Sequence, residues 1–217
     1  MPDPMTPGPS SDVLSALPTS EVAPPPAGLR LIAIGASAGG VEALGILLRA
    51  LPASCRAAVV VVLHLAPGRS SQLPQLYAER CQLPLREARD KEPLHAGTVY
   101  FAPPDYHLQI EPDGCFSLSQ EEPVYFSRPS IDVLLETAAL AYRRAMLAII
   151  LTGASADGAA GLARVRQLGG GAWVQEPAGA RCGIMPAAAL QRAGADRVLD
   201  LAQMAASLAL LGDGQSK

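Results

Sequence analysis

The sequence predicts an α/β domain with a doubly wound, mostly parallel sheet. Three observations carry this prediction. Strand-like and helix-like segments alternate after residue 28. The runs Ala57–Leu63 and Met146–Leu151 are wholly apolar, which is typical of central parallel strands buried on both faces. Asp113-Gly114 lies between two alternating runs and indicates an antiparallel hairpin, which we expect at the edge of the sheet.

The remaining elements follow from hydrophobic periodicity and from turn residues. We expect further parallel strands at Leu31–Ile34, Ala172–Val174 and Arg197–Leu199. Residues 84–119 contain short runs that we interpret as an antiparallel insert: Leu85–Ala88, Thr98–Ala102, His107–Ile110 and Cys115–Leu118. Apolar residues at helical spacing predict helices over 41–51, near Leu73–Tyr77 with Ser70 or Ser71 as cap, and over Ser130–Tyr142, 159–168, Pro186–Ala193 and Leu201–Leu211. This order is that of a Rossmann-like fold.

Composition suggests one domain with a tail at each end. Eight of the 20 prolines lie in the first 28 residues, which contain no basic residue, so we expect residues 1–28 to be a disordered tail. Residues 29–212 are long enough for one sizeable core, and we expect residues 213–217 to be flexible.

Charge and hydropathy exclude several classes of function. All 17 Lys and Arg follow residue 28 and three of the 20 acidic residues precede it, so the folded part is formally neutral. We therefore expect no nucleic-acid partner. No apolar run reaches the length of a membrane span, and the start is not a secretory signal. The four cysteines are widely spaced, which favours reduced thiols in a cytoplasmic protein over disulfides or a metal site.

Three residues that together suit one type of reaction follow three of the predicted strands. Ser37 follows the first strand, His64 the second, and Asp157 the turn after Met146–Leu151. Because the carboxyl ends of parallel strands meet at one edge, these side chains are expected to converge. A serine, a histidine and an aspartate are the groups that acyl transfer needs: nucleophile, general base and orienting carboxylate.

The same turns offer backbone donors for an oxyanion. We expect the N–H groups of Ala38 and of the Gly153–Ser155 turn, Ala154 above all, to serve this purpose. We expect neither a metal ion nor an organic cofactor.

Several segments, in order, resemble the catalytic domain of the CheB-type chemotaxis protein-glutamate methylesterases. The resemblance covers residues 30–212, and its motifs are IGASAGG from Ile34, VLHLAP from Val62, APPDYHL from Ala102, SRPSIDVL from Ser127, IILTGASADGAAG from Ile149 and GIMPA from Gly183. On this likeness Ser37 corresponds to the nucleophile, His64 to the general base and Asp157 to its carboxylate. The resemblance implies hydrolysis of γ-glutamyl methyl esters on the cytoplasmic helices of chemoreceptors, with release of methanol. For some members it also implies deamidation of receptor glutamines.

Two departures from the family pattern bear on activity and control. Family members usually carry Met-Gly where this chain has Ala154-Ser155, which changes the side chains of the turn but keeps its N–H groups. The typical member also has an N-terminal receiver domain. Here only the proline-rich tail precedes the catalytic part, so we do not expect phosphorylation control of the usual kind.

Other interpretations stay open at this level. Ser37 and Asp157 also suit helix caps, His64 suits a buried structural role, and for His107 a structural role is the better interpretation. A protein that keeps the fold without activity, a signalling scaffold, is therefore an alternative. The strand followed by GASAGG also permits a dinucleotide-dependent reductase, but none of the five tyrosines has a lysine four residues later, as a short-chain reductase requires.

Overall fold

The fold class predicted from the sequence is confirmed. In the computed structural model, which describes residues 25–64 and 72–212, a seven-stranded sheet has the order β3-β4-β2-β1-β7-β8-β9, and every neighbouring pair of strands is parallel. The strands are β1 (Leu31–Ala36), β2 (Ala58–Leu63), β3 (Leu85–Glu87), β4 (Val99–Phe101), β7 (Met146–Ile150), β8 (Gly171–Gln175) and β9 (Arg197–Leu199).

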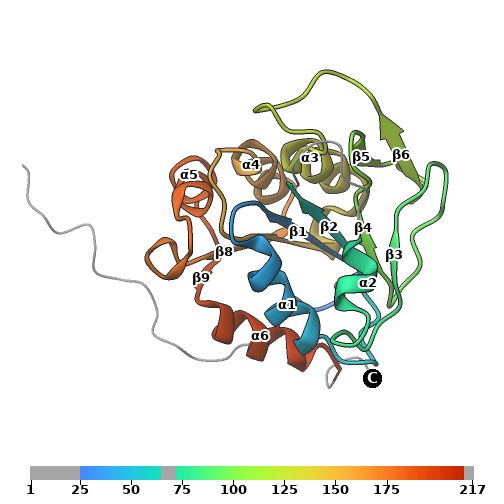
Figure 1. Cartoon of the computed structure of the whole chain (residues 1–217), viewed down its shortest axis with the longest axis horizontal. Helices are drawn as coiled ribbons and strands as arrows, with labels where there is room; N and C mark the ends of the chain where they lie inside the picture. Colours follow the sequence, from blue (N-terminus) through green and yellow to red (C-terminus); the bar gives the residue numbers. More distant parts are fainter. Residues whose placement is uncertain (1–24, 65–71, 213–217) are drawn as a thin grey trace, which may run out of the picture.

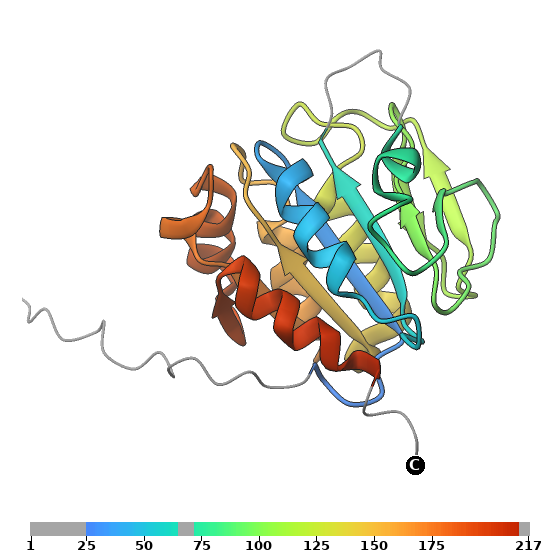
Figure 2. The same cartoon turned by 60° about the horizontal axis from the view of Figure 1, so that its bottom comes forward.

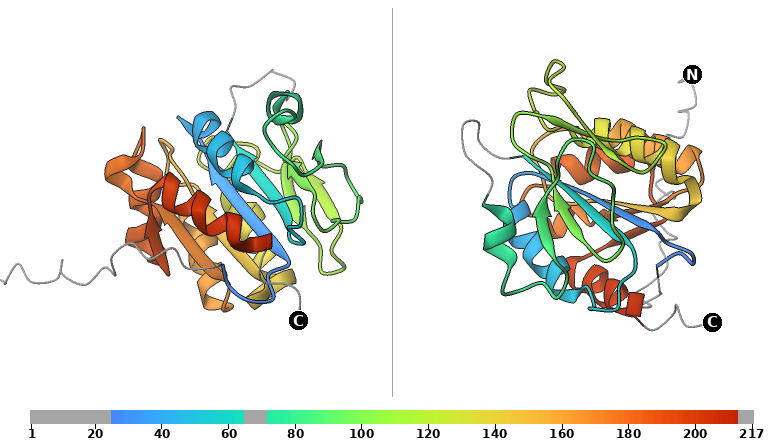
Figure 3. Two further views of the ribbon diagram at one scale, coloured as in Figure 1. Left: turned by 90° about the horizontal axis from the view of Figure 1, so that it is seen from below. Right: turned by 90° about the vertical axis from the view of Figure 1, so that its right-hand side faces the viewer.

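Helices cover both faces of the sheet (Figures 1 and 3). On one face lie α1 (Gly40–Ala50), α2 (Leu73–Tyr77) and α6 (Leu201–Ala209). On the other lie α3 (Ile131–Tyr142), α4 (Ala159–Gln167) and α5 (Ile184–Ala193). Short 3-10 turns follow α3 and α6 and precede α5, at Arg143–Ala145, Leu210–Gly212 and Pro177–Gly179.

The central strands show why the sequence folds this way. Every residue of β1, β2 and β7 is buried. Alternate side chains enter two separate cores: Ile32 and Ile34 pack toward α1 and α6, whereas Leu31 and Ala33 pack toward α3. An unbroken apolar run is therefore required, because neither face of these strands meets water.

Strand order places the candidate site. After β1 the chain forms β2, then the outermost strand β3 and then β4 between them, and only afterwards crosses to the other side of β1 with β7. In doubly wound sheets the crevice at such a reversal lies outside the carboxyl ends of the strands and is where ligands bind. In Figure 2 the carboxyl ends of β1 and β2 lie at the same end of the sheet, where Ala36 pairs with Leu63.

The interpretation of residues 84–119 as one antiparallel insert is wrong in part. β3 and β4 are parallel members of the main sheet. Only β5 (His107–Ile110) and β6 (Phe116–Ser119) are antiparallel, around Asp113-Gly114, and they form a separate two-stranded sheet rather than the edge of the main one. The sequence of a short strand does not show which other strand it pairs with. Val99 and Phe101 pair with β2 in the main sheet, where their side chains are fully buried.

The other predicted elements are present with small shifts at their ends. The helix near Leu73–Tyr77 is a short turn and follows Gln72, whereas the expected caps, Ser70 and Ser71, lie outside the described residues. The predicted disordered tail lies mostly outside them too, and the flexible end at 213–217 does so entirely.

α3 and α4 pack unusually closely at Gly161. A Cβ atom added there would lie 2.6 Å from the Cβ of Leu135 and 3.0 Å from the carbonyl oxygen of Asp132. Both obstacles are at or next to the backbone, so neither moves aside easily. The two helices therefore require a glycine at this point, close to where both of them begin.

We expect Gly161→Ala to lower the free energy of unfolding by about 1–3 kcal/mol, because the added methyl group forces the helices apart. Helix propensity alone predicts the opposite sign, a gain of up to about 1 kcal/mol. Gly45→Ala in α1 is the matched control, since its added Cβ would meet only a ring carbon of Tyr77, at 3.5 Å. Urea unfolding measures both. Equal stabilisation by the two substitutions would contradict the close packing.

Candidate functional site: a histidine-carboxylate pair beside a strand-to-helix turn

Ser37 lies on the tight turn between β1 and α1. The Ser37 N–H donates to the carbonyl of Thr152 (2.9 Å), and the Gly40 N–H closes the turn on the Ser37 carbonyl (2.7 Å). Gly39 has φ of 82°, which a glycine adopts without steric cost. The side chain of Ser37 is partly exposed and makes no hydrogen bond within the described part of the chain, so its hydroxyl is available to a ligand.

Thr152, in the turn that follows the neighbouring strand β7, fixes the serine turn. Its hydroxyl donates to the carbonyl of Ala38 (2.8 Å) and accepts from the Cys182 N–H (2.9 Å). The backbone N–H of Thr152 in turn donates to the side-chain oxygen of Gln175 at the end of β8 (2.8 Å). Thr152 and Gln175 are buried, so the turn that carries Ser37 is supported by a continuous polar chain across β7 and β8.

His64 stands beside this turn and is paired with Asp157. Its backbone N–H donates to the carbonyl of Ala36 (3.0 Å), which extends the β1-β2 register by one residue, toward Ser37. The Nε2 atom of His64 lies 2.9 Å from Oδ2 of Asp157. The imidazole is 10% exposed and the carboxylate is fully buried.

Asp157 is held at the N-terminus of α3. Its carboxylate accepts from the backbone N–H groups of Ile131 (2.7 Å) and Asp132 (2.9 Å) and from the hydroxyl of Ser130 (2.8 Å). Burial by itself would raise the pKa of Asp157, but the hydrogen bonds from His64, Asp132 and Ile131 outweigh it, and the pKa lies below its ordinary value. The group is thus a carboxylate at neutral pH, and it fixes the proton of His64 on Nε2.

The unprotonated ring nitrogen of His64 faces a second serine. Nδ1 lies 3.3 Å from the hydroxyl oxygen of Ser127, in the segment between β6 and α3. No hydrogen bond joins His64 to Ser37 in the described residues. The structure therefore brings His64 and Asp157 together as predicted, places Ser37 beside them, and adds Ser127 as the side chain that contacts the free nitrogen.

Asp132 completes an exchange of caps between two helices. Asp157 precedes α4 and caps α3, whereas Asp132 lies in the first turn of α3 and its Oδ1 accepts from the Gly161 N–H of α4 (2.7 Å). Gly158, the N-cap of α4, supplies no side-chain cap of its own. Burial, then the neighbouring Asp157 and Glu136 charges, raise the pKa of Asp132 to about 6 against the lowering effect of the backbone hydrogen bonds.

The predicted oxyanion donors are only partly available. The N–H groups of Ala38 and Ala154 donate to no acceptor among the described residues, and both residues are exposed. Gly153 is excluded, because its N–H donates to the carbonyl of Cys182 (3.0 Å). Ala38 and Ala154 therefore remain the two candidates from their respective turns.

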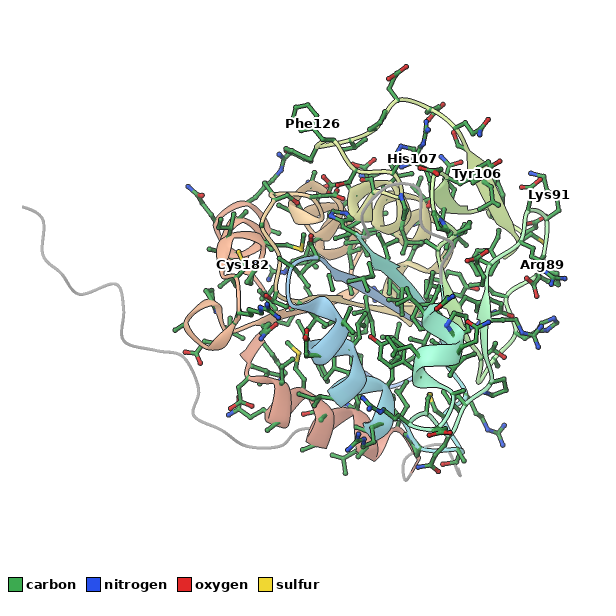
Figure 4. All side chains as sticks on the ribbon, viewed as in Figure 1. Arg89, Lys91, Tyr106, His107, Phe126 and Cys182 are labelled. Carbon is green, nitrogen blue, oxygen red and sulfur yellow. The ribbon has the colours of Figure 1, made fainter. Side chains whose placement is uncertain are left out.

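His107 has the structural role that the sequence favours. It is buried, its Nδ1 accepts from the Ser130 N–H (3.1 Å), and its Nε2 donates to the carbonyl of Glu122 (3.1 Å). Both ring nitrogens are thus occupied by backbone groups. Figure 4 labels His107 near the start of α3, which it anchors.

Thr152, Ser127 and Asp132 lie within segments that resemble the family, but no sequence pattern indicated the contacts that they make in the site. Thr152 and Ser127 act through contacts across the fold that no local spacing indicates. For Asp132 the sequence shows only an acidic residue in the first turn of a helix, which is ordinary. Its burial, which is unusual for such a residue, is visible only in the structure. Among the described residues no group of three or more His, Cys, Asp or Glu is placed to hold a metal ion.

Comparison with known proteins decides the family. Residues 32–208 match the model of the CheB methylesterase family. The chain belongs to this family. A crystal structure of the Thermotoga maritima CheB methylesterase catalytic domain superimposes with a TM-score of 0.80 at 31% identity, over 84% of this chain and 98% of that domain.

Curated relatives of this CheB-family chain differ in length. A Leptospira interrogans protein, to which protein-glutamate methylesterase and protein-glutamine glutaminase activities are provisionally attributed, is 42% identical over 80% of this chain and 90% of its own. The protein-glutamate methylesterase/protein-glutamine glutaminase of Salmonella typhimurium is 36% identical over 86% of this chain but only 54% of its own. These relatives are hydrolases by name. In the described part of this chain, no helix has the length and apolar character to cross a membrane.

We expect Asp132→Asn to raise the free energy of unfolding at pH 8 by on the order of 2 kcal/mol. The pKa of Asp132 is raised by folding, so its contribution to stability is full below about pH 4 and is lost as the pH rises through about 6. The asparagine still accepts from the Gly161 N–H but carries no buried charge. Urea unfolding at pH 8 and pH 5 measures the difference, which shrinks at the lower pH.

The exposed Glu79 provides the control, since Glu79→Gln removes a charge without a buried partner. A destabilisation by Asp132→Asn that is larger at pH 8 than at pH 5 would contradict this expectation and show that the carboxylate charge is needed for the α4 cap.

We expect Thr152→Val to slow labelling by a fluorophosphonate probe about ten-fold or more. Valine keeps the shape of the side chain but loses the hydrogen bonds to the Ala38 carbonyl and the Cys182 N–H, so the turn that carries Ser37 loosens. Thr152→Ser keeps the hydroxyl and should restore most of the rate. Equal labelling of the valine and serine variants would show that this hydroxyl does not position the turn.

Proposed function

We propose that this protein is a serine hydrolase that removes methyl groups from glutamate γ-methyl esters of chemoreceptors in the cytoplasm and releases methanol. We propose that residues 29–212 form its catalytic domain. The observation that carries the proposal is the buried Asp157-His64 pair next to an exposed serine turn, in a chain of the CheB methylesterase family.

In this proposal each group has one role. Asp157 keeps the proton of His64 on Nε2, so Nδ1 is free to accept the proton of the Ser37 hydroxyl as its oxygen attacks the ester carbonyl. The N–H groups of Ala38 and Ala154 stabilise the oxyanion that forms. His64 then returns the proton to the methoxide as methanol leaves. Water, activated by the same nitrogen, hydrolyses the acyl-enzyme and regenerates Ser37.

The two ring nitrogens have exchanged the positions familiar from chymotrypsin-like proteases, where Nδ1 faces the carboxylate. The chemistry is unaffected, because it requires only that the carboxylate hold one N–H and that the other nitrogen be free. The same steps act on a glutamine side chain, with ammonia as the leaving group, and the names of the relatives support this second activity.

A scaffold without activity is the second candidate. It is favoured by the contact of Nδ1 with Ser127 in place of Ser37 and by Ala154-Ser155 at the position where the family usually has Met-Gly. The two candidates differ in one observable property, the reactivity of the Ser37 hydroxyl.

We expect Ser37→Ala and His64→Ala each to lower methanol release from methylated chemoreceptor membranes by at least about 10³-fold, without unfolding the protein. Ser127→Ala should keep the activity within about ten-fold, because Ser127 contacts the imidazole but does not attack the ester. Circular dichroism checks the fold of each variant. A fluorophosphonate probe should label the unsubstituted protein and the Ser127→Ala variant.

Each contrary result has a distinct meaning. Loss of labelling in Ser127→Ala but not in Ser37→Ala would make Ser127 the nucleophile. No labelling and no methanol from the folded, unsubstituted protein would favour the scaffold.

A further inference from the structure

The segment between β6 and α3 carries two exposed aromatic side chains, Tyr125 and Phe126. The Phe126 side chain is fully exposed and that of Tyr125 is half exposed, at 103% and 47% of their reference areas. Figure 4 shows the Phe126 ring standing away from the body of the molecule. Because Phe126 is fully exposed, packing within the described residues does not explain a phenylalanine in this position.

The turn that presents these side chains is closed and tight. Val124 and Ser127 exchange two backbone hydrogen bonds, of 3.1 and 2.9 Å, so Tyr125 and Phe126 are the two central residues. Both have positive φ, 48° and 60°. Glycine and asparagine are the residues that relieve such a turn, and aromatic residues here carry a steric cost. The sequence thus keeps two unfavourable residues where the turn itself favours others.

The base of the turn is fixed against the catalytic pair. The Arg128 guanidinium donates to the carbonyls of Gln120 (2.9 Å) and Glu121 (3.0 Å), which ties the two ends of the segment together. Ser127, next to Phe126, lies 3.3 Å from Nδ1 of His64. The exposed ring is therefore one residue away from a contact with the general base.

A second exposed apolar side chain lies near the opposite turn of the site. Ile184, the first residue of α5, is 57% exposed. Its neighbour Met185 donates its N–H to the carbonyl of Gly153 (2.9 Å), directly before the candidate oxyanion donor Ala154. The site thus has exposed apolar side chains next to both the histidine and the oxyanion turn.

We propose that the Tyr125-Phe126 turn binds apolar side chains of the protein substrate that flank the glutamyl ester. This inference rests on the proposed function and names the surface that recognises the substrate. When a glutamyl ester on a substrate helix reaches Ser37, the helix itself stays outside the site. The residues that surround the site therefore contact the substrate side chains that flank the ester. The Phe126 side chain, fixed near His64, buries apolar surface in such a contact and in no other contact among the described residues.

The experiment compares a protein substrate with a small ester. Burial of one aromatic side chain corresponds to a change in binding of about ten-fold or more. Phe126→Ala should therefore raise KM for methylated chemoreceptor membranes about ten-fold, leave kcat within about two-fold, and leave hydrolysis of p-nitrophenyl acetate unchanged. Phe126→Leu should recover part of the loss. Ile46→Ala is the matched control, because Ile46 is 44% exposed on α1, across the sheet.

Binding is also measured without catalysis. In a Ser37→Ala background, co-sedimentation with receptor-containing membranes should fall when Phe126→Ala is added and should not fall with Ile46→Ala. Receptor-free membranes are the reference, and equal binding to them would identify a lipid surface as the occupant and overturn the proposal.

The remaining outcomes separate this inference from the proposed function. Unchanged KM and unchanged co-sedimentation in Phe126→Ala would overturn the docking role while leaving the esterase activity intact. Absence of methanol from the unsubstituted protein would overturn the esterase activity, and the co-sedimentation result would still decide whether the turn binds the receptor.

Discussion

The buried carboxylate of Asp157 is the constraint on which the site depends. A charge without access to water is stable only when its oxygens are fully hydrogen bonded, and here four donors meet it: His64, Ser130, Ile131 and Asp132. Three of them belong to the start of α3, where the helix dipole also favours an anion. The same contacts that stabilise the charge therefore fix the position of α3 and the orientation of the imidazole at the end of β2.

The serine turn is supported separately. Gln175 and Thr152 connect the ends of β8 and β7 to the backbone around Ser37, and none of these bonds involves Asp157 or His64. The two supports meet only at the carboxyl end of the central strands, where β1 lies between β2 and β7. The parallel register is thus what sets the serine beside the histidine, and the polar contacts on either side set their directions.

Close packing of α3 against α4 is a consequence of the same arrangement. Each of these helices receives a cap from the other, through Asp157 and Asp132. Such an exchange is possible only if the two N-termini approach each other, and Gly161 permits the approach. Burial first, and then the neighbouring charge of Asp157, raise the pKa of Asp132, which is the cost of placing a second buried carboxyl group beside the first. Both carboxyl groups lie where α3 and α4 begin, next to the site.

The sequence by itself determined the alternation of strands and helices and the central strands, because burial on both faces leaves an unbroken apolar run and small residues mark the turns. It also singled out Ser37, His64 and Asp157, whose catalytic roles stay a prediction. It also determined the family, through several motifs in order. It did not determine that Val99 and Phe101 join the main sheet, that Gly153 uses its N–H elsewhere, or that Ser127 contacts His64. Only the tertiary structure decided these points, because each depends on a partner far away in the chain, and local spacing carries no information about which distant group that partner is.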